Sequence, residues 1–70
     1  MQRILLAVEF DESGWHVLMR GKRIDRYDSC AAAIDAAARF ARTRHDATGE
    51  PTGVIAPTGF GETVMIETCG

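Results

Sequence analysis

The sequence of 70 residues predicts a single small α+β domain, in which one long helix packs on one face of a mostly antiparallel sheet of four to five strands. Three observations predict this fold class. The segment Ser29–Asp46 is Ala-rich and amphipathic, the remaining apolar segments are short and alternate with a period of two, and Gly, Pro and Asp separate them. The expected element order is β-β-β-α-β-β.

The start of the chain predicts two strands joined by a hairpin. In Ile4–Phe10 the even positions are apolar, which is the pattern of a strand with one buried face. The segment 11–14, with the sequence DESG, has the polar, Gly-ending composition of a hairpin loop. In the second strand we expect the odd positions to face the core, with Trp15 as the largest contributor, followed by Val17 and Met19.

Three further strands are predicted from the same kind of pattern. A short charged strand, Arg23–Tyr27, follows a tight turn at residues 21–22. Its charges suit the edge of a sheet, where they oppose pairing with another chain. Two more strands, Gly53–Pro57 and Glu62–Cys69, flank the Gly-rich hairpin loop 58–61.

The helix Ser29–Asp46 has a recognisable start, face and end. Ser29 is the expected N-cap, and Gly49 the residue that ends the helix. The side expected to be buried carries Cys30, Ala33, Ile34, Ala37, Ala38, Phe40 and Ala41. The opposite side carries two possible i,i+4 ion pairs, Asp35/Arg39 and Arg42/Asp46.

One helix cannot cover five strands, so part of one sheet face is expected to be open. In the last strand, alternation places Val64 and Ile66 on one face and Thr63, Met65 and Glu67 on the other. The apolar residues expected to line the open face are Leu5, Leu18, Ile55 and Met65. An exposed apolar face indicates a partner. Because so short a chain buries only about 60% of its unfolded surface, we expect it to self-associate as a homodimer.

A group of basic side chains is the alternative functional candidate. If the charged hairpin and the helix were adjacent, these side chains could bind the phosphates of a nucleic acid. They are Arg20, Lys22, Arg23, Arg26, Arg39 and Arg42. However, the net charge is −2 and the pI is about 5.5, whereas nucleic-acid-binding modules are usually strongly basic. A solvated surface of ion pairs is therefore the favoured interpretation, and nucleic-acid binding is not.

The sequence contains no pattern that is typical of catalysis. His16 and His45 have no Asp, Ser or Cys partner at a diagnostic spacing. Cys30 lies at the start of the helix, where a thiolate is favoured, but a buried structural cysteine is the favoured interpretation. Cys69 is isolated near the end of the chain, and no His/Cys cluster has the spacing of a metal site. We therefore expect a protein that is not an enzyme and has no metal and no cofactor.

The apolar run Ile4–Val8 is too short for a signal peptide and far shorter than a membrane span of roughly 20 residues. A buried strand is the favoured interpretation of this run. The expected protein is soluble and cytoplasmic, without a membrane partner.

Short motifs along most of the chain resemble the small bacterial proteins grouped as domain of unknown function 2188. They are Trp15-His16-Val17, a charged hairpin before a Ser-capped helix, Ala33-Ile34-Asp35-Ala36-Ala37 with Phe40-Ala41, and Val54-Ile55 before Gly59 and Gly61. The long apolar first strand and the lack of a Lys/Glu-rich helix start depart from that pattern. The resemblance implies a compact α+β fold and a bacterial protein without assigned activity. It supplies no catalytic residues.

Overall fold

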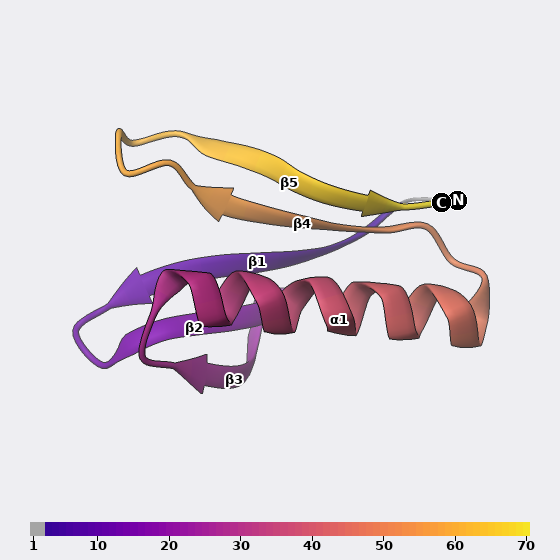
Figure 1. The fold of residues 1–70 in the computed structure, drawn as a ribbon, viewed down its shortest axis with the longest axis horizontal. Coiled ribbons are helices and arrows are strands. Elements are labelled where there is room, and N and C mark those ends of the chain that lie inside the picture. The colour runs from indigo at the N-terminus through magenta and orange to yellow at the C-terminus, as the bar shows by residue number, and fades with distance from the viewer. Residues whose placement is uncertain (1–2) are drawn as a thin grey trace.

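The computed structural model describes residues 3–70, which form one helix and five strands. The elements are β1 (Ile4–Asp11), β2 (Gly14–Met19), β3 (Lys22–Tyr27), α1 (Cys30–Thr48), β4 (Thr52–Pro57) and β5 (Thr63–Cys69). Helix α1 lies along one face of the sheet (Figure 1). The predicted fold class and element order are both confirmed.

The sheet consists of two antiparallel units that meet at its centre. The strand order is β3-β2-β1-β4-β5, and only the central neighbours β1 and β4 are parallel. This parallel pairing covers only Ile4–Ala7 and Thr52–Ile55. Beyond it the β4–β5 hairpin diverges from β1 (Figure 1), and Phe10 and Pro57 lie on opposite walls of a groove of about 350 Å³. The two units are therefore joined over half of their length only.

The turn between β2 and β3 lies one residue earlier than predicted. Its central residues are Arg20 and Gly21, both with positive φ, at 55° and 79°. Positive φ at both central positions is typical of a type I′ turn, whose twist matches that of antiparallel strands. Arg20 is the one described residue other than glycine with positive φ, so a basic side chain occupies a position that usually holds Asn or Gly.

The predicted cap and stop residues define helix α1. The side chain of Ser29 accepts a hydrogen bond of 3.1 Å from the backbone N–H of Ala32. Gly49 has φ 74°, and its N–H donates to the carbonyl of His45 at 2.7 Å. The helix extends two residues beyond the predicted end, to Thr48, because the left-handed glycine rather than the last apolar residue ends it.

The centre of the core is aliphatic and small. The fully buried side chains of the sheet lie beneath a row of alanines from α1; the core includes Leu6, Val17, Thr52, Val54, Ala33, Ala37 and Ala41. The hydroxyl of Thr52 donates to the carbonyl of Ala41 at 2.9 Å, so this buried polar group is satisfied. Trp15 is only partly buried and packs in a tilted arrangement against Phe10 at the end of the sheet.

Phe40 is a correction to the predicted helix face. It was expected to be buried with the alanines, but 46% of it is exposed. Its ring lies between two open hollows beside the helix, one shared with Tyr27 and the other with Met19. The helical pattern predicts the direction of a side chain, but it does not predict how far the sheet extends beneath it.

Candidate interaction surface on the open sheet face

The face of the sheet opposite α1 is covered by no described element, and it carries the predicted apolar residues. Strand pairing places Leu18, Ala7, Ile55 and Met65 in one row across β2, β1, β4 and β5. Leu5 lies in the next row, opposite Gly53. All four predicted residues of the dimer face therefore share one surface. Leu5 and Met65 are exposed, whereas Leu18 and Ile55 are partly buried.

At Gly53 the absence of a side chain lets neighbouring side chains pack directly on the backbone of β4. A Cβ atom built there would lie 3.1 Å from the sulfur of Met65 and 3.1 Å from the Cδ of Arg3, so both side chains lie over the bare backbone. The guanidinium of Arg3 donates to the carbonyl of Thr52 at 2.7 Å. A Cβ atom at position 53 would require Met65 and Arg3 to shift by a few tenths of an ångström. At this position glycine is favoured by the close contacts and not by backbone conformation.

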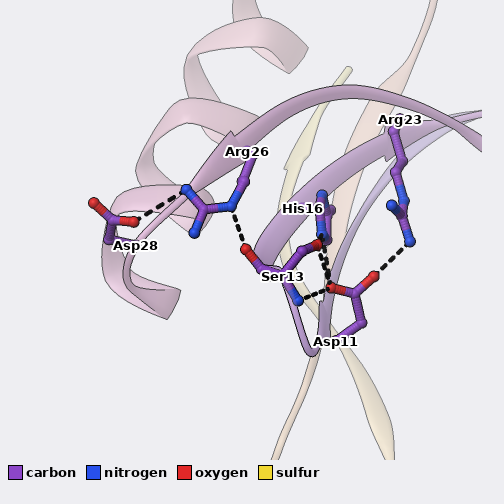
Figure 2. Close-up of polar contacts among 6 residues, drawn as sticks. All are labelled: Asp11, Ser13, His16, Arg23, Arg26 and Asp28. Atoms are coloured by element: carbon purple, nitrogen blue, oxygen red, sulfur yellow. Dashed lines mark hydrogen bonds and ion pairs between the residues drawn. The ribbon is translucent and has the colours of Figure 1, made fainter.

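The other half of the open face is polar and centres on Asp11 (Figure 2). Its carboxylate accepts hydrogen bonds from the backbone N–H of Ser13 at 2.8 Å, the hydroxyl of Ser13 at 2.6 Å and Nε2 of His16 at 2.9 Å. Its second oxygen forms an ion pair with Arg23 at 2.5 Å. One carboxylate thus links the β1–β2 turn to β2 and to β3.

These donors stabilise the charged form of the carboxylate. The hydroxyl of Ser13, then its backbone N–H and then His16, hold the pKa of Asp11 well below its ordinary value of 3.8. His16 itself is only 5% exposed although it lies on the open face. Ser13 and Asp11 contact its ring at Nε2.

The cluster contains Ser, His and Asp but does not have the geometry of a catalytic triad. In a triad, one ring nitrogen of the histidine faces the nucleophile and the other faces the carboxylate. Here both Ser13 and Asp11 approach the same nitrogen, Nε2, and the serine hydroxyl donates to the aspartate. An ionised carboxylate can only accept, so the contact between Asp11 and Nε2 requires a proton on that nitrogen. A protonated Nε2 has no lone pair with which to take a proton from Ser13. The arrangement stabilises a turn.

Arg26 completes the polar half. Its Nε donates to the carbonyl of Ser13, and its Nη1 lies 3.1 Å from the carboxylate of Asp28. A Cβ atom at Gly14 would lie 2.9 Å from this guanidinium, and Gly14 has φ 127°. Gly14 thus permits both the backbone conformation of the hairpin and the approach of Arg26.

The structure does not gather the six candidate nucleic-acid-binding residues on one surface. Arg23 and Arg26 lie on the open sheet face, whereas Arg39 and Arg42 extend from α1 on the opposite side. Each of these four has a carboxylate partner: Asp11, Asp28, Asp35 and Glu67, respectively. Arg20 and Lys22, in the β2–β3 turn and at the start of β3, form no ion pair within residues 3–70.

Arg42 also corrects a predicted ion pair. Alternation had placed Glu67 on the face of Met65, and Asp46 was the expected partner of Arg42. A β-bulge at Ile66 shifts the register, so that Glu67 is opposite the buried Val54 and lies on the helix side. There its carboxylate meets Arg42 at 2.9 Å. A bulge inserts one residue, and period-two reasoning fails on its far side.

The bulged strand β5 is more exposed than the sequence indicated, because Val64 and Ile66 are exposed together with the predicted Met65. Val64, Met65 and Ile66 are consecutive and are 38%, 48% and 46% exposed. Phe60, at the tip of the preceding hairpin, is 91% exposed. The alternating pattern divided the side chains of this strand between two faces, but the position of the strand at the end of the sheet is a long-range property that the pattern does not contain.

Within the part of the chain that the structure describes, no group of three or more His, Cys, Asp or Glu side chains is placed to hold a metal ion. Helix α1 is not apolar enough to cross a membrane. Cys30 and Cys69 are both free thiols and partly buried.

Comparison with known proteins identifies no relative: no family model, no curated protein and no solved structure matches the chain. The resemblance to domain of unknown function 2188 therefore stays a prediction.

Proposed function

We propose that this chain is a non-enzymatic interaction module that self-associates, and that the apolar half of its open sheet face takes part in the contact. The observation that carries the proposal is the row Leu18, Ala7, Ile55 and Met65 with Leu5 beside it. Contiguous apolar surface on a small protein is typical of an interaction site.

The polar half of the same face supports binding rather than chemistry. Asp11, Ser13 and His16 use their hydrogen-bonding groups on one another. A general base or a nucleophile needs a free lone pair directed at a substrate. The cluster instead holds the β1–β2 turn against β3, and so keeps the polar half of the face rigid beside the apolar half.

Light scattering coupled to size-exclusion chromatography tests the proposal. We expect the wild-type chain at high concentration to have an apparent mass near twice its 7.6 kDa. Leu5→Lys, which adds a charge to the open face, is expected to shift the mass toward that of the monomer. Phe40→Lys is the matched control, because Phe40 is a similarly exposed apolar residue on the helix side. A wild-type monomer at every concentration contradicts the proposal.

Nucleic-acid binding is the alternative function to self-association. A salt-dependent mobility shift with an oligonucleotide, weakened by both Arg23→Ala and Arg39→Ala, would require these residues to leave their carboxylate partners and act together. We expect no shift at low salt, because the four candidate arginines that pair with carboxylates lie on two sides of the molecule.

A further inference from the structure

Strand β5 has an outer edge with which no other described strand pairs. This edge runs along Thr63–Cys69. An exposed apolar edge of this kind is a template for the addition of another strand. The tip of the β4–β5 hairpin and this edge lie away from α1 (Figure 1), so the helix does not obstruct an approaching strand.

The exposed side chains of β5 point to both faces of the sheet. Val64 is opposite the buried Ala56 and therefore lies on the helix side, whereas Met65 is opposite Ile55 and lies on the open side. A partner packed on the open face would cover Met65 but not Val64. A strand added along the edge contacts side chains on both faces at once. The exposure pattern therefore favours an added strand.

We propose that β5 pairs antiparallel with β5 of a second copy of this chain about a two-fold axis at Val64, so that one sheet continues through both copies. The proposal rests on the self-association proposed above and adds the edge of β5 to the open sheet face as a second part of the contact. The β-bulge at Ile66 sets the register, because the regular stretch of β5 before it is Thr63–Met65, whose middle residue is Val64.

Charge favours a second copy as the occupant. Around this axis Val64 is opposite itself, and Thr63 is opposite Met65, so no like charges face each other. Glu67, which carries the one charge of β5, is compensated by Arg42 of its own chain. Identical strands satisfy a two-fold contact because each surface is its own complement.

The other sheet edge does not offer an alternative. Strand β3 presents Lys22, Arg23, Asp25 and Arg26, and such charges on an edge oppose strand addition. A head-to-tail contact from β5 to β3 would also leave both ends open and build a fibre. A closed pair of β5 edges uses the apolar edge of each copy and leaves the charged edges in water.

Phe60 adds to the contact. In the proposed register the hairpin tip of one copy lies alongside the C-terminal half of the second copy's β5. The ring, 91% exposed in the single chain, would then pack on a neighbouring strand. The interface remains small, so the dimer is expected to be weak and to form at high protein concentration.

Val64→Lys distinguishes pairing of the β5 edges from self-association through the open sheet face alone. It places two ammonium groups directly opposite each other at the axis but leaves the open face unchanged. We expect the apparent mass to fall from twice 7.6 kDa to 7.6 kDa. Leu5→Lys alters the face and not the edge, and Phe40→Lys serves as the control for an added charge. If Val64→Lys leaves the dimer intact while Leu5→Lys dissociates it, the edge proposal is overturned and self-association stands.

Hydrogen exchange of the wild-type chain tests the same proposal without any substitution. It is decisive if Val64→Lys fails to fold, or if Val64→Lys and Leu5→Lys both dissociate the dimer. The outward amides of β5 should exchange in proportion to the fraction of monomer, and therefore roughly tenfold more slowly when nine-tenths of the chains are paired. Amides of β3 should show no such dependence on concentration. Unchanged exchange in β5 at concentrations where the mass doubles overturns the proposal. A monomer at all concentrations overturns it as well, and leaves a foreign strand as the occupant of the edge.

Discussion

The two edge strands of this sheet differ in nearly every property that controls association. Strand β3 is charged, it continues directly into α1, and Arg23 and Arg26 bind it to the β1–β2 turn. Strand β5 is apolar, and outside its hairpin with β4 its one ion pair is Glu67 with Arg42. One edge is therefore held by its own chain, and the other is available to a second chain.

The comparison shows that protection of a sheet edge has two separate parts. Charge repels an added strand, and polar contacts within the chain keep the edge strand in place. Strand β3 has both parts. In strand β5 the polar contacts lie at the C-terminal end, where Glu67 meets Arg42 and the carbonyl of Cys69 accepts from Arg3. The bulge at Ile66 bends the edge locally but leaves the segment Thr63–Met65 regular and without charge.

The largest expected loss of stability comes from truncating a buried core residue that packs next to an edge strand. Val54 is fully buried and lies between Leu6 and Glu67 in the strand pairing, so Val54→Ala should loosen β5. The lost burial and the cavity together should lower the free energy of unfolding by about 1–3 kcal/mol. Val17→Ala is the matched control, because Val17 is equally buried but is paired with Asp25 of β3.

Hydrogen exchange read strand by strand checks this prediction. Val54→Ala should accelerate exchange in β5 more than in β3, and Val17→Ala should do the reverse. Equal acceleration of both strands by both variants would show that the sheet opens as one unit and would remove the distinction between the edges.

Asp11→Asn should release the β3 edge. The carboxylate accepts from Ser13 and His16 and pairs with Arg23, and an amide cannot replace all of these contacts. Because the pKa of Asp11 is lowered in the folded state, its charge stabilises the fold above the ordinary value of 3.8, and this contribution is lost as the pH falls below that value. The difference in stability between wild type and variant should therefore be largest at neutral pH and shrink in acid.

Urea unfolding at a series of pH values measures that difference. Asp28→Asn is the control, since it removes the same charge from an exposed carboxylate that pairs with Arg26. A difference for Asp11→Asn that stays constant from neutral pH into acid would contradict the role assigned to this carboxylate.

Ser29→Ala tests the junction between β3 and the helix. The substitution removes the hydrogen bond to the N–H of Ala32 and should lower stability by about 1 kcal/mol. Exchange should increase in the first turn of α1 and at the end of β3, and not in β5. Ser29→Asn supplies another capping side chain and should restore most of the loss; failure of that rescue would mean that Ser29 acts through something other than its cap.

Local chemistry made the helix and most strands predictable. Ser29 and Gly49 define the ends of α1 through contacts within a few residues, and period-two alternation located the strands. Alternation separated the two faces of each strand, but the placement of Leu5, Leu18 and Ile55 on one open face also depended on the strand register.

The remaining features depend on pairing between distant segments. The bulge at Ile66 arises where β5 meets β4, and only then does Glu67 reach Arg42. The exposure of Phe40 depends on where the sheet ends beneath the helix. The partners of Asp11 lie within a few residues, except Arg23, but their convergence requires the hairpin to be folded.

The smallest predicted effect concerns the ion pair that links β5 to the helix. Glu67→Gln removes the partner of Arg42, and Asp35→Asn removes the equivalent partner of Arg39 within the helix. Both pairs are largely exposed, so each substitution should lower stability by about 0.2–1 kcal/mol. Only Glu67→Gln should accelerate exchange in β5, because Asp35 and Arg39 are both on α1. If the two substitutions affect β5 alike, the link between Arg42 and Glu67 has no specific role in positioning that edge, and β5 depends on its pairing with β4 alone.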